Sequence, residues 1–314
     1  MTTQKPAALI LCGLLLAFAE IIQAQVAPFT VKEVGPNVWA VIADVTGPAG
    51  GNTGFVIGDD GVLVIDTFVS TDAATQLLAK IRKQTNLPIK YVVNTHYHFD
   101  HVGGNQVFVN EGAVVLAQRN VRSWIHSENL RLAGPDVKPD LKAAIEAVTA
   151  PTVLYDQTLD LYLGSRKIEV RSFPGHTGGD SVVVIPDAKV AFGGDLFWRE
   201  ILPNLIDATT KTWVETLDTL TKTMPGYTFV PGHGDVGRLQ DVTAFRDYLA
   251  ALRQQVSDAR AQGKSGDALA DAVMSSLTPK YGRWDAYSYL AKPNIVDVDA
   301  ELSGKKRIPQ AESK

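Results

Sequence analysis

Cysteine is almost absent from this sequence of 314 residues. The single Cys12 lies in an apolar run near the N-terminus, and this run is typical of a secretory signal peptide spanning residues 1–24. We expect cleavage after Ala24, so that the mature chain begins near Gln25. Such a chain has no thiol, which excludes disulfides, thiolate nucleophiles and cysteine metal ligands.

A long membrane-spanning run and an excess of basic residues are also lacking. The apolar stretch Ala7–Ala19 is followed by Glu20 and is shorter than the roughly 20 residues that cross a bilayer, which favours export over the alternative of a membrane anchor. The formal net charge is -4, whereas nucleic-acid binding usually needs a basic face. We expect a periplasmic or secreted protein with no stable membrane anchor and no nucleic-acid partner.

What the sequence does contain is a dense histidine loop, His96-Tyr97-His98-Phe99-Asp100-His101. Neutral imidazole and carboxylate are the ligands that zinc prefers when no thiolate is present. His96 and His98 are two residues apart in an extended segment, so they project to the same side and can chelate one ion. Asp100 and His101 follow where the backbone turns, and the pattern therefore indicates a metal site.

The segments around this loop predict an α/β fold. Gly58-Asp59-Asp60-Gly61 is expected to be a hairpin turn, and Ser70 or Thr71 is expected to cap a helix. Strands are predicted over residues 38–43, 53–57, 62–65, 89–93, 113–117, 159–163, 167–173, 181–185, 190–193 and 228–231. Helices are predicted over residues 70–85, 119–132, 137–148, 210–223, 239–262 and 267–277.

Two segments leave alternatives open. The glycine-rich stretch 46–52 is either a plain turn or a mobile flap beside a site. Beyond residue 237 we expect a helical extension and a polar tail, residues 238–314, packed on a main domain of residues 25–237. The aromatic residues Tyr281, Trp284, Tyr287 and Tyr289 either pack this extension on the domain, which we favour, or wall the cleft. Lys305-Lys306-Arg307 is predicted to be a solvated end.

Further candidate ligands stand directly after strands of the second half. His176, Asp195 and His233 are each flanked by glycine, which lets the backbone bring a side chain into a crowded centre. Each alone is more simply a hydrogen-bonded loop residue. Five of the six histidines, however, lie in these contexts and in the loop; only His126, on a predicted helix, is left as a surface residue.

In this order, the His-x-His-x-Asp-His, Gly-His, Gly-Asp and Pro-Gly-His-Gly motifs resemble the metallo-β-lactamase superfamily. The resemblance covers roughly residues 31–236 and implies an αββα sandwich of two mixed sheets with a metal cleft along one edge. It further implies two zinc ions, with iron or a mixed pair as alternatives, and Asp66 as a residue that orients the ligand loop. One ion would be held by His96, His98 and His176, the other by Asp100, His101 and His233, with Asp195 bridging them.

Segments such as Asn204-Leu205-Ile206-Asp207-Ala208 are similar to subclass B1 β-lactamases, but two positions depart from that pattern. Asp195 replaces a cysteine ligand, as in glyoxalase II and lactonases. Trp198 replaces the lysine that holds the carboxylate of the antibiotic, and it is either a wall of the substrate site or a core residue. The resemblance puts Trp198 and Asn204 at substrate-binding positions, and Arg199 is a candidate to supply the missing charge.

The function that this pattern predicts is metal-dependent hydrolysis of a small-molecule substrate. A metal-bound hydroxide, oriented by Asp100, would open an amide or ester carbonyl. β-Lactams are the first class to consider, although Asp195 puts efficient turnover in question, and lactones, esters or thioesters are the alternative. A mono-iron persulfide dioxygenase and a non-catalytic metal-binding module are less favoured readings. The sequence does not indicate the oligomeric state.

Overall fold

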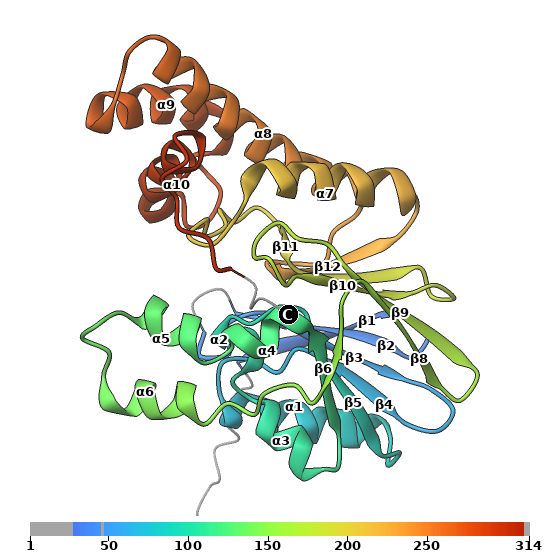
Figure 1. Ribbon diagram of the computed structural model, residues 1–314. Coiled ribbons are helices and arrows are strands. Elements are labelled where there is room, and N and C mark those ends of the chain that lie inside the picture. The colour runs from blue at the N-terminus through green and yellow to red at the C-terminus, as the bar shows by residue number, and fades with distance from the viewer. Residues whose placement is uncertain (1–27, 45–46, 311–314) are drawn as a thin grey trace, which may run out of the picture.

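The computed structural model describes residues 28–44 and 47–310, so the expected signal peptide lies outside the described residues. Two β-sheets form the centre of the molecule (Figure 1). The first has the order β1-β2-β3-β4-β5-β6-β7 and the second β12-β11-β10-β9-β8. The first sheet consists of β1 (Phe29–Gly35), β2 (Val38–Ala43), β3 (Thr53–Ile57), β4 (Val62–Ile65), β5 (Ile89–Asn94), β6 (Val114–Gln118) and β7 (Val153–Tyr155). The second consists of β8 (Thr158–Leu163), β9 (Arg166–Ser172), β10 (Ser181–Ile185), β11 (Val190–Trp198) and β12 (Thr228–His233).

The two sheets pack face to face because their strands alternate apolar residues on both sides. In β4, Leu63 and Ile65 join the core between the sheets, while Val62 and Val64 pack on the helices of the outer face. Both sheets mix parallel and antiparallel pairs. The predicted αββα sandwich is therefore confirmed.

Helices cover both outer faces (Figure 1). The first sheet is covered by α1 (Thr71–Gln84) and α3 (Asn105–Asn110), which follows the short α2 (Phe99–Val102). The second is covered by α7 (Thr210–Thr223) and α8 (Leu239–Ala261), on which α9 (Gly266–Tyr281) and α10 (Tyr287–Leu302) pack. The remaining helices, α4 (Arg119–Trp124), α5 (Ser127–Ala133) and α6 (Pro139–Glu146), lie beside the histidine loop.

Several local predictions hold. Ser70 caps α1, accepting a hydrogen bond from the backbone N–H of Ala73, and β3 and β4 form the expected hairpin. Other predictions were wrong. The helix expected over 119–132 is two helices with His126 between them. Residues 287–302 are a helix rather than part of a polar tail; Pro293 inside α10 obscures it in the sequence.

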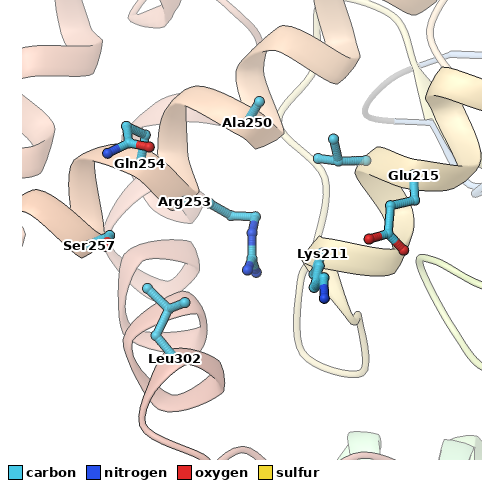
Figure 2. Close-up of a pocket in the computed structure, with 8 residues that line it drawn as sticks. Lys211, Glu215, Ala250, Arg253, Gln254, Ser257 and Leu302 are labelled. Atoms are coloured by element: carbon cyan, nitrogen blue, oxygen red, sulfur yellow. The ribbon is translucent and has the colours of Figure 1, made fainter.

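The C-terminal helices share one core with the second sheet. Figure 2 shows the junction, where Arg253 of α8 points between α7 and the end of α10. Its Nη1 donates to Thr210 Oγ1 and to Glu301 Oε1 at 2.6 and 2.7 Å. The extension thus packs on the sandwich, with Tyr281 and Tyr287 buried in the shared core and Tyr289 exposed. Within the described ranges, no helix combines the length and apolar character needed to traverse a lipid bilayer.

Candidate metal centre

The histidine loop begins where β5 ends, and Asp66 fixes its start. Asp66 follows the neighbouring parallel strand β4, and the carboxyl ends of parallel strands meet at one edge of a sheet. Its Oδ1 accepts the backbone N–H of Thr95 at 2.7 Å, and its Oδ2 accepts the hydroxyl of Thr95 at 2.7 Å. Oδ2 also lies 2.9 Å from Nδ1 of His101, so that Nε2 of this ring faces the centre. These contacts of Asp66 hold the first residue after β5 and the ring of His101.

The loop fits because two glycines let it pack against the segment that follows β4. A Cβ atom at Gly103 would lie 2.2 Å from the carbonyl oxygen of Val69, and one at Gly104 would lie 2.2 Å from that of Thr67. Close backbone approach, rather than an unusual backbone angle, requires glycine here. Behind the loop, the buried amides of Asn94 and Asn105 exchange hydrogen bonds of 2.9 Å.

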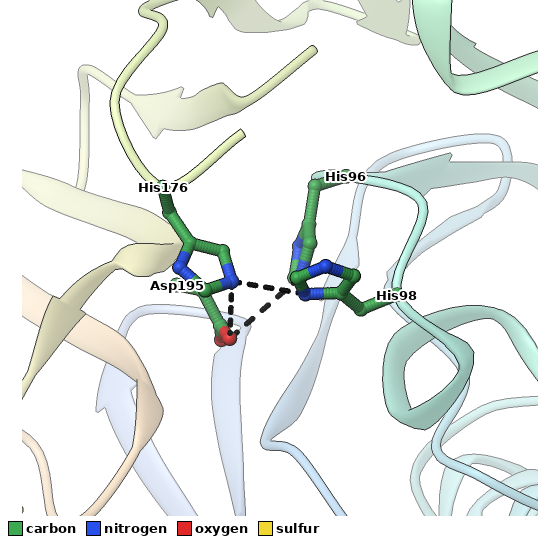
Figure 3. Close-up of side chains that lie close together, drawn as sticks. All are labelled: His96, His98, His176 and Asp195. Atoms are coloured by element: carbon green, nitrogen blue, oxygen red, sulfur yellow. Dashed lines mark hydrogen bonds and ion pairs between the residues drawn. The ribbon is translucent and has the colours of Figure 1, made fainter. Parts of the chain in front are cut away.

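Three histidines and one aspartate form the first ligand group (Figure 3). His96, His98, His176 and Asp195 each offer an atom within 4.8 Å of the others, and all four are buried. Nε2 of His176 lies 2.9 Å from Nδ1 of His98 and 3.3 Å from Oδ2 of Asp195. His96 Nε2 lies 3.7 Å from the same oxygen.

Asp100, His101 and His233 form the second group. Nε2 of His233 lies 3.3 Å from Oδ2 of Asp100, and Nε2 of His101 lies 3.7 Å from it. Asp195 turns its other oxygen to this group, with Oδ1 at 3.0 Å from His101 Nε2 and 3.5 Å from His233 Nε2. One carboxylate thus lies between the two groups, as the resemblance implies for a bridging ligand.

These residues fit metal ions on their own chemistry. Nε2 of His96, His101 and His233 and Oδ1 of Asp195 are buried, and despite the short distances given above none of them makes a well-aligned hydrogen bond. Buried polar atoms are rarely left unpaired unless an ion or a water satisfies them. A set of imidazoles and carboxylates without sulfur suits zinc and other divalent transition metals.

The electrostatics favour positive charge at the second group and neutral imidazole at the first. Burial lowers the pKa of His96 well below its ordinary value and that of His176 to about 3, which keeps both rings neutral, as a ligand must be. Burial alone would lower the pKa of His101 and of His233 too. The carboxylates of Asp195 and Asp100 outweigh it, raising the pKa of His101 well above its usual range and that of His233 to about 9. The same carboxylate field would attract a divalent cation.

The backbone of two glycines, Gly51 and Gly232, lies directly against this centre. A Cβ at Gly51 would lie 2.3 Å from Nε2 of His101, and a Cβ at Gly232 would lie 1.9 Å from Oδ1 of Asp195. The side-chain amide of Asn52, which is 3% exposed, donates to the carbonyl oxygens of Pro231 and Gly234 at 2.9 and 2.8 Å. The described part of the glycine-rich segment, residues 47–52, is therefore anchored beside the site.

Two further aspartates, for which the sequence had indicated no role, hold the ligand segments. Asp180 Oδ2 accepts the backbone N–H of Thr177 at 2.7 Å, next to His176. Asp207 accepts the hydroxyl of Tyr97, and its Oδ2 lies 3.8 Å from Nε2 of His98. Asp207 stands in the segment quoted for the family resemblance, and that was the only signal for it.

A cavity of about 250 Å³ opens onto the metal centre. Trp198 lines it and stacks on the ring of His233, with centroids 3.9 Å apart, so Trp198 is both a wall and a packed residue. Asn204 lines the cavity as well, while its Oδ1 accepts the N–H of Ile206. The remaining lining is Phe99, Asn129, Leu132, Ala133, Leu141 and Ile145, together with the ligand residues His98, Asp100, His176, Asp195 and His233.

Arg199 and His126 lie elsewhere. Nη1 of Arg199 donates to the carbonyl oxygen of Val236 at 2.7 Å, and its Nε lies 3.4 Å from Asp241. Arg199 borders a different cavity, together with Trp198, Tyr281 and Trp284, so it does not supply a cation to the cavity at the metal centre. Nε2 of His126 lies 2.8 Å from the carbonyl oxygen of Val148.

Comparison with known proteins gives concordant matches. A family model described as the metallo-beta-lactamase superfamily matches residues 46–233. The chain is 26% identical over 269 residues to a linear primary-alkylsulfatase of a Pseudomonas strain; the match covers 73% of this chain but only 50% of the alkylsulfatase. It is 23% identical over 227 residues to the type 2 metallo-beta-lactamase of Bacillus cereus, covering 69% and 81% of the two chains. A hydroxyacylglutathione hydrolase of Mesorhizobium japonicum is 28% identical over 183 residues, or 55% of this chain and 61% of the relative.

A solved metallo-beta-lactamase from Pontibacter korlensis shares the fold. It superposes with a TM-score of 0.58 at 24% identity, over 71% of this chain and 99% of the other. The relatives named in these matches thus include an alkylsulfatase, a beta-lactamase and a hydroxyacylglutathione hydrolase. Residues beyond 233, which include α8, α9 and α10, lie outside the family match.

Proposed function

Because this chain belongs to the metallo-beta-lactamase superfamily, we propose that it is an exported two-metal hydrolase that opens a carboxylic ester, lactone or thioester of a small uncharged substrate. The observation that carries the proposal is the position of Asp195. Its two oxygens face two separate groups of buried imidazoles. A bridging carboxylate is a means of holding two ions close together, as two-metal hydrolysis needs.

The residues divide the work as follows. His96, His98 and His176 would hold one ion, and Asp100, His101 and His233 the other, with zinc as the proposed metal. The ions would supply Lewis acidity and lower the pKa of bound water, in other enzymes to about 7. Asp100 would accept a hydrogen bond from the attacking water and orient it. Its carboxylate is the most exposed of the ligand side chains and borders the cavity.

The lining of the cavity supports an uncharged substrate. Among the described residues that line it, none is a lysine or an arginine. Phe99, Leu132, Leu141, Ile145 and Trp198 give it an apolar wall, while Asn129 and Asn204 offer polar contacts that can orient a carbonyl. At about 250 Å³ the cavity is slightly smaller than most ligand sites, which are about 300–1,000 Å³. Apart from the proposed metal ions, a bound carboxylate would meet no cationic side chain in this lining, and its desolvation would be less well compensated than in a site with a lysine or arginine.

β-Lactam hydrolysis is the second candidate, and the match to the Bacillus cereus enzyme over 81% of that relative favours it. The described residues that line the cavity include no lysine or arginine, and this argues against efficient turnover, because these substrates carry a carboxylate.

The test is a hydrolysis panel with zinc-loaded mature protein, residues 25–314. A chromogenic cephalosporin, an uncharged lactone, an uncharged aryl ester and a thioester are compared by kcat/KM, alongside metal analysis. We expect two zinc ions per chain and turnover of the uncharged substrates well above that of the cephalosporin. Preferred turnover of the cephalosporin would contradict the proposed substrate class. One iron per chain with oxygen consumption would contradict hydrolysis itself.

A pair of histidine variants controls the assay. His98→Ala removes a ligand of the first group, and we expect it to abolish hydrolysis while the protein stays folded. His126→Ala removes a histidine that lies outside both ligand groups, and it should retain both metal and activity. Equal activities of the two variants would refute the ligand assignment.

A further inference from the structure

The C-terminal segment 303–310, which follows α10, packs against the metal-site half of the molecule. The basic run Lys305-Lys306-Arg307 was predicted to be solvated. This was wrong for Lys306, which is partly buried and hydrogen-bonded to backbone carbonyls, whereas the side chain of Arg307 is 56% exposed and nevertheless pairs with Glu128. Both make hydrogen bonds to segments about 100 or more positions earlier in the chain. Because the segment lies outside the family match of residues 46–233, nothing in that match assigns it a role.

Arg307 begins a chain of charged contacts. Its Nη1 and Nη2 donate to the two carboxylate oxygens of Glu128 on α5 at 2.9 and 2.7 Å. Glu128, which is buried, also accepts from Nε of Arg131. Nη2 of Arg131 in turn donates to both oxygens of Asp207 at 2.6 and 2.7 Å. The Arg307–Glu128 pair is bidentate, with one nitrogen on each oxygen, and pairs of that kind fix orientation as well as distance.

Lys306 acts on the same aspartate by a second route. Its Nζ donates to the carbonyl oxygens of Leu205 and Ala208 at 2.5 and 2.7 Å. These two carbonyls lie on either side of Asp207 in the sequence, so Lys306 holds the turn that carries it. The two neighbouring basic residues therefore fix the backbone and the carboxylate of Asp207 independently.

Asp207 connects this arrangement to the metal centre. It binds the hydroxyl of Tyr97 and faces Nε2 of His98, whose Nδ1 faces the first ligand group. The helix that Arg307 clamps, α5, also supplies Asn129, Leu132 and Ala133 to the wall of the cavity. A shift of the C-terminal segment would thus be transmitted both to the metal ligand His98 and to the cavity wall formed by α5.

We propose that Arg307 is a positioning residue, which acts through Glu128 and Arg131 to hold Asp207, and with it the ring of His98, in place for metal binding. This inference rests on the metal site of the proposed function. Arg307 touches neither substrate nor ion, and its effect is on the affinity for metal rather than on the chemical step.

The test is a zinc titration of the metal-free mature protein against a chromogenic chelator. Mutation of a residue that is hydrogen-bonded to a metal ligand typically weakens metal affinity by about 10–100-fold. Arg307 is further from the ligands, so we expect Arg307→Ala to raise the dissociation constant of one zinc by about threefold to tenfold. Arg307→Lys keeps the charge but loses the two-pronged contact, and it should weaken binding less. Arg260→Ala is the matched control, because Arg260 of α8 pairs with Asp299 of α10 in the same C-terminal region. It should leave both dissociation constants unchanged.

A double-mutant cycle separates positioning from general destabilisation. If Arg307 acts through Glu128, then Arg307→Ala should add little to the effect of Glu128→Gln on zinc affinity. Equal dissociation constants for Arg307→Ala and Arg260→Ala, or additive effects in the cycle, would refute the positioning role. If circular dichroism shows that Arg307→Ala is unfolded, Arg307→Lys decides the question, and a wild-type zinc affinity there would overturn the proposal. Failure of the wild-type protein to bind zinc would instead refute the proposed function, so the two failures are distinguishable.

Discussion

Gly51 offers a sharp test of how closely the glycine-rich loop approaches the metal site. In Gly51→Ala the added methyl group would lie 2.3 Å from Nε2 and 2.4 Å from Cε1 of the His101 ring. Contacts below 3.0 Å do not persist, so the ring or the loop must move by roughly 1 Å. The ring is held by Asp66 at 2.9 Å behind it and faces Asp195 at 3.0 Å in front. The loop is held in turn by the hydrogen bond of Asn52 to Gly232, which is 2.6 Å long.

Either movement disturbs the second ligand group. Overpacking of this kind typically costs about 1–3 kcal/mol of stability, and a misplacement of about 1 Å at a catalytic group can cost about 100-fold in rate. We therefore expect Gly51→Ala to fold, to bind nearer one than two zinc ions per chain, and to show a kcat about 100-fold lower. Elemental analysis after dialysis gives the metal content, and the best substrate of the panel gives kcat.

Gly193→Ala is the control for this experiment. A methyl group there would lie 3.6 Å from its nearest neighbour, Phe197, which is an ordinary contact. Two zinc ions and full activity in Gly51→Ala would show that the loop does not lie against His101, and the reasoning about this side of the site would be refuted.

Three further predictions test other parts of the account. Asp66→Asn replaces the carboxylate that orients His101, and zinc titration should show about tenfold weaker binding of one ion; unchanged affinity would contradict that role. Leu141→Ala removes an apolar side chain from the cavity wall, and this side chain is already 40% exposed. The KM for an apolar ester should therefore rise several-fold while Tm changes little. The control Val296→Ala, at a residue of α10 that is 57% exposed, should change neither KM nor Tm. Burial alone would raise the pKa of Glu301, but hydrogen bonds from Thr210 and the charge of Arg253 lower it below its ordinary value of 4.5. Because its pKa is lower in the folded state, ionised Glu301 stabilises the fold above pH 4.5, and this contribution is lost as the pH falls through the folded-state pKa. The Tm difference between wild type and Glu301→Gln should therefore shrink on acidification. A difference independent of pH would contradict this.

The sequence predicts the ligand-bearing segments well because their positions follow from local rules. His96 lies two residues after β5, His176 lies four residues after β9, and His233 is the last residue of β12. Asp195, expected directly after a strand, lies within β11. Strand ends in such sheets commonly carry ligands. The hairpin at residues 58–61 and the cap at Ser70 are equally local. Where polar residues lie at the ends of strands and helices, local composition and spacing are sufficient to predict where those residues lie in the fold.

The contacts that brace the site could not be predicted in the same way. Arg307 meets Glu128 across 179 positions of sequence, and no local pattern distinguishes its basic run from a solvated end. A proline such as Pro293 disfavours a helix interior, yet α10 forms because it packs into the core shared with α8 and α9. The choice between turn and flap for residues 47–52 depended on Asn52 reaching Pro231 and Gly234, which is a tertiary contact.

An anomalous-scattering measurement at the zinc edge, on crystals of the zinc-loaded protein, would locate the ions directly. We expect two zinc peaks, one beside His96, His98 and His176 and the other beside Asp100, His101 and His233, with Asp195 between them. A single peak at full zinc loading, or a second peak away from Asp195, would contradict the two-metal site.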